Sequence, residues 1–180
     1  MAEPKRTRLY FFGFAEERVA HTVLEVIKDG ISKKEIVVED WALVHKAPGG
    51  KLTITNDKKK DPGAARGGLF GGAAGLVLAT LSGPVGLGAV AGGAAIGAAT
   101  AAIKDSGFKN DDIQTVSTFM ADGRTGIMLG TPLADAPQFD AFVAEHPEFD
   151  ASDRKHQVDI VPGRDFDRAV EEYARKESGE

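Results

Sequence analysis

Residues 67–103 read GGLFGGAAGLVLATLSGPVGLGAVAGGAAIGAATAAI, a stretch of 37 residues without a single charged side chain. This Gly/Ala stretch contains 11 Gly, 11 Ala and 11 large apolar residues. Glycine disfavours an isolated helix in water by about 1 kcal/mol per residue relative to alanine, and flexible Gly/Ser linkers do not carry this many Leu, Val and Ile. The composition therefore predicts helices stabilised by lipid, by each other or by neighbouring subunits. A flexible low-complexity loop is the alternative.

The Gly/Ala stretch divides at Gly83 and Pro84, a pair that favours a turn. The two arms, residues 67–82 and 85–103, would form helices of about 24 and 28 Å, close to the roughly 30 Å of a hydrocarbon core. Glycines recur every four residues, the glycine-zipper spacing that lets another helix backbone approach closely in a bilayer. The helix-packing glycines are Gly67, Gly68, Gly71, Gly72, Gly75, Gly88, Gly92, Gly93 and Gly97.

Basic residues flank the Gly/Ala stretch on both sides: Lys58, Lys59, Lys60 and Arg66 precede it, and Lys104 follows it. Because cytoplasmic loops are enriched in Lys and Arg, this pattern predicts a transmembrane hairpin with both ends on the cytoplasmic side. The alternative for residues 58–60 is a solvated charge cluster in a loop. The first arm has only six large apolar residues, so stable insertion requires association with other helices.

The rest of the sequence alternates between strand and helix patterns. Residues 7–14 are aromatic and aliphatic on both sides, as in a central strand, and 16–28 carry apolar residues at helical spacing. Residues 36–46 and 51–56 predict a hairpin. Further on, residues 110–123 predict a helix that begins at Asn110 or Asp111, and residues 125–131 predict a strand. Residues 137–146 predict a helix with Pro137 in its first turn. Residues 158–161 predict a short strand, and residues 165–176 predict a final helix.

Removing the Gly/Ala stretch leaves strand, helix, strand, strand, helix and strand, the order of a ferredoxin-like split unit. We therefore expect an α+β fold in two parts. The first is a ferredoxin-like βαββαβ body made of residues 7–57 and 108–176. The second is the glycine-zipper hairpin, residues 67–104, inserted between the third strand and the second helix. The remaining helix, strand and helix form a C-terminal αβα extension, which extends the sheet at one edge or covers it.

The order of these features resembles a known bacterial family. A ferredoxin-like half, the GGLFGGAAG sequence of residues 67–75, a Gly-Pro turn, a second small-residue arm and the DSGFKNDDI sequence of residues 105–113 together resemble the bacterial domain-of-unknown-function family twelve sixty-nine. The resemblance covers residues 8–161 and implies a membrane protein. The chain departs from the family pattern in its second arm, which is unusually rich in Gly and Ala, and in the helical end from residue 165.

Composition and motifs argue against several other classes of protein. A net charge of −5 disfavours general binding to nucleic acid, and the absence of cysteine removes disulfides and thiolate chemistry. The apolar residues 9–15 are soon followed by Glu16 and Glu17, so no cleavable signal peptide is expected. The four histidines lie on separate predicted elements without a second metal ligand, and Asp111 and Asp112 fit the start of a helix. We expect no catalytic residue, no cofactor and no metal.

These observations favour a non-enzymatic, membrane-associated protein that associates with itself through its hairpin in the bacterial cytoplasmic membrane, with most of the chain on the cytoplasmic side. The expected partners are copies of the same chain and the lipid bilayer. The first alternative is a cytoplasmic, soluble homo-oligomer, such as a cage, tube or filament subunit, whose hairpins bury one another. The second is an enzyme with a ligand pocket between the sheet and the helices near Trp41 or His45.

Overall fold

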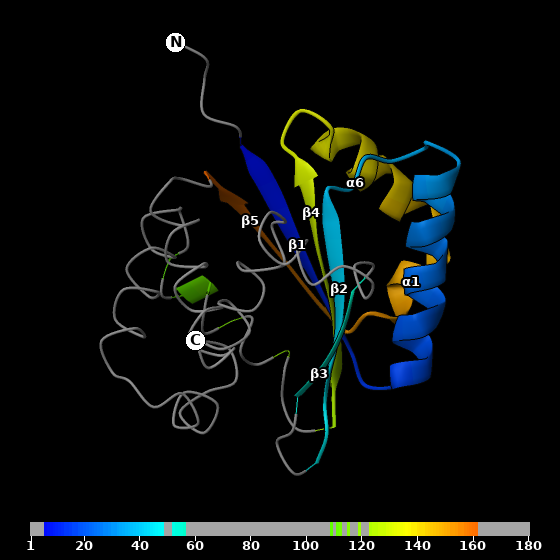
Figure 1. Ribbon diagram of the computed structural model, residues 1–180, viewed down its shortest axis with the longest axis vertical. Coiled ribbons are helices and arrows are strands. Elements are labelled where there is room, and N and C mark those ends of the chain that lie inside the picture. The colour runs from blue at the N-terminus through cyan, green and yellow to red at the C-terminus, as the bar shows by residue number, and fades with distance from the viewer. Residues whose placement is uncertain are drawn as a thin grey trace, which may run out of the picture.

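The computed structural model describes residues 6–48, 52–56, 109, 111–112, 115, 119 and 123–161, and for 52–56 it describes the backbone alone. The described part forms a five-stranded antiparallel sheet with the order β3-β2-β4-β1-β5. The strands are β1 (Thr7–Phe14), β2 (Asp40–Lys46), β3 (Leu52–Asn56), β4 (Thr125–Pro132) and β5 (Arg154–Ile160). The fold is thus a mixed α and β structure built on one sheet (Figure 1).

Strand β1 lies near the middle of the sheet, between β4 and β5. Its aromatic side chains suit a pleated surface, and successive residues point to opposite faces. Tyr10, Phe12 and Phe14 face one side, while Leu9 and Phe11 face the other, and all five are buried. The prediction of a strand buried on both sides is confirmed, and β1 is an interior strand, although β4 is the middle one of the five.

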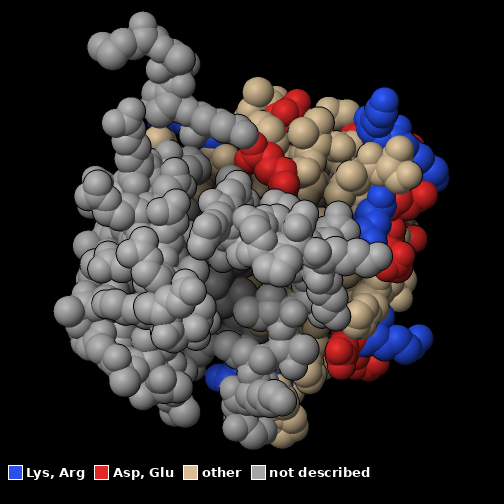
Figure 2. Space-filling model, viewed as in Figure 1, with Lys and Arg blue, Asp and Glu red and all other residues tan. Residues whose placement is uncertain are grey.

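In the described part of the chain, two helices and one short 3-10 helix cover a single face of the sheet: α1 (Glu17–Ser32), α6 (Ala136–Glu145) and η3 (Pro147–Ala151). Figure 1 shows α1 and α6 together on that side, which we call the helix face. The outward side of α1 carries the ion pairs Glu25–Lys28 and Asp29–Lys33. Figure 2 shows acidic and basic side chains interspersed there, as on a solvated helix surface.

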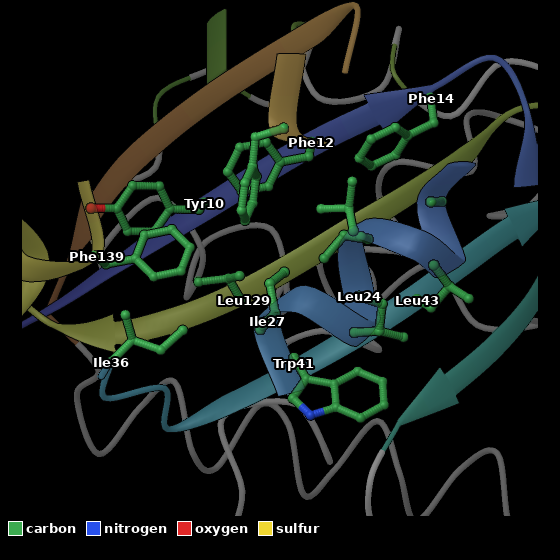
Figure 3. Packing of buried hydrophobic residues seen from close by; sticks show 14 of the residues in the cluster. Tyr10, Phe12, Phe14, Leu24, Ile27, Ile36, Trp41, Leu43, Leu129 and Phe139 are labelled. Atoms are coloured by element: carbon green, nitrogen blue, oxygen red, sulfur yellow. The ribbon is translucent and has the colours of Figure 1, made fainter. Parts of the chain in front are cut away.

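The main core lies between the sheet and these helices. Sheet residues such as Phe12 and Leu129 meet Leu24 and Ile27 of α1 and Phe139 of α6 in one continuous cluster (Figure 3). Phe149 meets the rings of Phe139 and Phe142 edge-on, and Phe139 and Phe142 stack on each other, which are arrangements that aromatic rings favour. This cluster fixes α6 and η3 against β1.

The element types predicted for residues 7–14, 36–46 with 51–56, and 125–131 are confirmed, and so are the helices at 16–28 and after Pro137. The order of the strands differs from the expectation. Residues 52–56 pair with β2 at the edge of the sheet, and β4 occupies the position between β2 and β1. Only residues 47–51 join β2 to β3, so these two strands pair with each other, while β4 pairs with the other side of β2 and with β1.

The residues expected to form a C-terminal extension belong to the sheet itself. Strand β5 pairs along its whole length with β1, and α6 packs in the main core. The expectation that this helix and strand extend the sheet at one edge or cover it is therefore confirmed, because β5 forms an edge of the sheet and α6 lies over one face. The predicted helix at 165–176 lies outside the described residues.

Candidate functional site

The residues predicted to pack helices or to contact the membrane all lie in residues 57–108, outside the described part of the chain. They are Gly67, Gly68, Gly71, Gly72, Gly75, Gly88, Gly92, Gly93 and Gly97, the turn residues Gly83 and Pro84, and the basic residues Lys58, Lys59, Lys60, Arg66 and Lys104. The described residues do fix the two points between which this segment runs, and these points define the candidate site.

The segment leaves the sheet at one edge and returns at the other. It follows Asn56 of β3, which pairs with Ala42. On its return, Asp112 accepts a hydrogen bond from Nε2 of His156 on β5, at 2.8 Å. Strands β3 and β5 are the two outer strands of the order β3-β2-β4-β1-β5, so four strand spacings, or about 19 Å, separate the two ends.

The returning chain is helical at residues 111, 112, 115 and 119. Phe119 is buried, and a Cβ atom on Gly13 would lie 3.4 Å from the Cβ of Phe119. Gly13 pairs with Arg154 and belongs to the same face as Leu9 and Phe11. The returning helix therefore lies on the side of the sheet opposite α1 and α6.

We call this second side of the sheet the outer face. Its apolar residues, which alternate along the strands with those of the helix face, are Leu9, Phe11, Ala42, Val44, Met128, Val158 and Ile160. Each of them is buried, with at most 7% of its surface exposed. Burying a large apolar side chain contributes about 1.5–3 kcal/mol relative to leaving it exposed. The outer face is thus a second apolar layer of the protein.

Small residues lie among the bulky ones on the outer face. Gly126 and Gly130 of β4 pair with Gly13 and Leu9 of β1, and Gly126 also pairs with Val44 of β2. Because glycine has no side chain, the backbone of β4 at these points is open to close approach. The residue pattern of β1 predicts two buried sides, but the pattern of one strand does not reveal a surface shared by four. The continuous apolar residues 9–12 and 41–44 were the available signal, because strands buried on both sides lack alternation.

A polar network joins β1 to its neighbours on the helix face. The Tyr10 hydroxyl donates a hydrogen bond to Oδ1 of Asp140 on α6 at 2.7 Å, and Arg8 binds both carboxylate oxygens of Asp159. Burial, followed by the bond to Asp140, raises the pKa of Tyr10 well above its usual value, and the bond from Arg8 lowers the pKa of Asp159. This network fastens α6 and β5 to β1.

A cavity of about 220 Å³ opens beside this network, and Tyr10, Phe12, Asp140, Val143, Lys155, His156 and Gln157 line it. Ligand pockets are usually about 300–1,000 Å³, so this one is small. Its tyrosine is held protonated and already donates to Asp140. Among the described residues that line it, no activated nucleophile contacts a general base. The cavity lies where α6 and β5 are joined to β1.

The residues named for an enzyme pocket are engaged in other contacts. Trp41 is buried in the core, with Nζ of Lys28 5.1 Å from its ring centre. Nδ1 of His45 lies 2.9 Å from the Thr125 hydroxyl and 4.0 Å from a carboxylate oxygen of Glu17. Among the residues that the structure describes, no three His, Cys, Asp or Glu side chains gather to hold a metal ion.

Comparison with known proteins gives no relative for this chain: no family model, curated protein or solved structure matches it. The resemblance to family twelve sixty-nine therefore stays a prediction from the motifs. Within the described residues, no helix has the length and apolar character needed to cross a membrane.

Proposed function

We propose that this protein is a non-enzymatic, membrane-associated protein that binds copies of itself. Its Gly/Ala stretch enters the bacterial cytoplasmic membrane as a glycine-zipper hairpin, and its α+β body stays on the cytoplasmic side. The observation that carries the proposal is the uncharged run of residues 67–103, which has basic residues before and after it. Glycine-rich helices of this kind are stable where lipid or another helix surrounds them.

The position of this run in the fold supports the proposal. Its two ends follow and precede elements of one sheet, so a hairpin that enters the membrane leaves the whole described body on a single side. The basic residues at both ends then lie next to the same membrane surface. A single spanning helix would instead have to separate β3 from β4, which belong to the same sheet.

We also propose that the body is a ferredoxin-like fold with one added edge strand. Strands β1 and β2 are both antiparallel to β4, so they are parallel to each other, and α1 joins them. In the same way, β4 and β5 are both antiparallel to β1, and α6 joins them. Two interleaved βαβ units of this kind support the split ferredoxin-like arrangement. In this assignment β3 is the added strand, and the Gly/Ala stretch is inserted between β3 and β4.

Flotation of the full-length protein with vesicles of phosphatidylethanolamine and phosphatidylglycerol tests membrane association. We expect the protein to float with the vesicles and to resist a carbonate wash. Leu76→Lys places a charge within the first arm, where insertion costs about 2.5–3.5 kcal/mol more, and should abolish flotation. Asp57→Lys introduces the same side chain outside the stretch and should leave flotation intact. Recovery of the unmodified protein in the soluble fraction would contradict the proposal.

Self-association is tested separately in detergent by chemical cross-linking. Gly71→Ile combined with Gly75→Ile keeps the first arm apolar but fills its small-residue groove, so we expect flotation to persist and cross-linked oligomers to disappear. Ala73→Ile, which lies on another side of a helix, serves as the matched control. A discrete large particle seen by light scattering without lipid or detergent would instead favour the soluble homo-oligomer and overturn the membrane proposal.

A further inference from the structure

The outer face of the sheet is apolar and buried, and the described chain supplies little to cover it. Of the residues that the structure describes outside the sheet, Phe119 lies against this face beside Gly13, and Asp112 contacts it through His156. Phe11, Val44 and Met128 are nevertheless at most 3% exposed. The described residues therefore account for only part of the cover over this face.

The course of the chain bears on what provides the rest of this cover. Residues 57–108 must connect Asn56 at one edge of the sheet with Lys109 and Asp112 at the other. Helices α1 and α6 already occupy the helix face, as Figure 1 shows. Fifty-two residues reach far more than the roughly 19 Å across the sheet, so a path over the outer face is open to them.

The Gly/Ala stretch has the chemistry that the outer face requires. It is uncharged, and it ends at residue 103, only a few residues before the helix that carries Asp112 and Phe119. Its glycines allow a helix backbone to approach closely, and Gly126 and Gly130 leave the backbone of β4 open on the same face. Bulky residues such as Phe11 and Met128 on either side provide apolar contact for its Leu, Val and Ile side chains.

We propose that the outer face is the binding site, within the same chain, for the Gly/Ala stretch in the absence of a membrane. This inference rests on the proposed function and extends it, because the stretch then has two alternative apolar environments, the sheet and the bilayer. Insertion into lipid requires the stretch to leave the sheet first. The outer face thereby shields the stretch in water and competes with the membrane for it.

Photo-cross-linking from Met128 tests this binding site in the full chain. A diazirine analogue replaces methionine in a Met120→Leu variant, so that Met128 carries the internal probe on the outer face. We expect lipid-free protein to yield cross-links between Met128 and residues 67–103 of the same molecule. The matched control, Met128→Leu with Leu129→Met, moves the probe by one residue to the helix face, where it should capture α1 or α6 instead.

Vesicles separate the two proposals. We expect cross-links from Met128 to residues 67–103 to fall at least severalfold when vesicles are added, while the control cross-links to α1 or α6 stay unchanged. Three results would overturn the inference even if the protein floats with vesicles. They are cross-links from Met128 to residues 162–180, cross-links to a second copy identified by mixed isotope labelling, and no cross-link to any peptide. Persistent capture of residues 67–103, with no flotation, would uphold the binding site and contradict the proposed membrane function.

Discussion

At the scale of single residues, the alkaline limit of stability depends on Tyr10. The folded state raises the pKa of its buried hydroxyl, so above about pH 10 the unfolded state releases this proton more readily and stability falls as pH rises. In a Tyr173→Phe variant, which leaves Tyr10 as the one tyrosine, tyrosinate absorbance should appear only as the circular dichroism of the fold is lost. Ionisation near pH 10 in a folded protein would contradict this prediction.

Gly30 is a second residue at which a substitution should change the free energy of unfolding in a definite direction. A Cβ atom there would lie 2.7 Å from Cζ of Phe142 and 3.2 Å from Cδ1 of Ile36. The Phe142 ring is held by Phe149 and His146 and has little room to move. Overpacking costs about 1–3 kcal/mol, which outweighs the gain of up to about 1 kcal/mol in helix propensity.

Urea unfolding should therefore show a lower free energy of unfolding for Gly30→Ala, by about 1–2 kcal/mol. Phe142→Leu removes the ring that the new Cβ meets. In that background Gly30→Ala should be close to neutral, and this double-mutant cycle separates the clash from the change in propensity. Equal costs in both backgrounds would show that Phe142 is not the cause.

At the scale of elements, helix α1 has a start that can be improved. Its N-cap residue, Glu16, is exposed and extended, and within the described helix its side chain makes no capping hydrogen bond. A shorter carboxylate reaches the first free backbone N–H groups, so Glu16→Asp should raise the free energy of unfolding by about 1 kcal/mol. Glu16→Gln changes the charge without providing a good cap and should give no gain in a thermal melt.

The elements themselves were predictable, whereas their pairing was not. The apolar spacing of α1 and the aromatic residues of β1 are local signals, and both elements formed where the pattern placed them. The position of β4 between β2 and β1 depends on contacts far apart in the sequence, which no local pattern contains. The hydrogen bond from Tyr10 to Asp140 joins residues 130 positions apart, and the outer face becomes a surface only when three or more strands are aligned.

At the scale of the whole molecule, the sheet separates two apolar layers with different roles. The helix face is closed by α1, α6 and η3, so its core is permanent. The outer face carries the contacts of Asp112 and Phe119, which follow the Gly/Ala stretch in the sequence. If the stretch exchanges between this face and lipid, weakening the outer face shifts the exchange toward the membrane, and weakening the helix face does not.

A matched pair of substitutions measures this exchange. Val44→Thr places a hydroxyl on the outer face and Val23→Thr places one in the helix-face core, and both valines are 1% exposed. Burying an unpaired hydroxyl costs about 1–3 kcal/mol, and the hydroxyl at residue 44 regains water when the stretch leaves the sheet. Val44→Thr should therefore lower the lipid concentration for half-maximal flotation at least about fivefold, since about 1.4 kcal/mol corresponds to tenfold. Val23→Thr should leave flotation unchanged whatever its effect on the free energy of unfolding, and equal flotation of both variants would show that the outer face does not compete with the membrane.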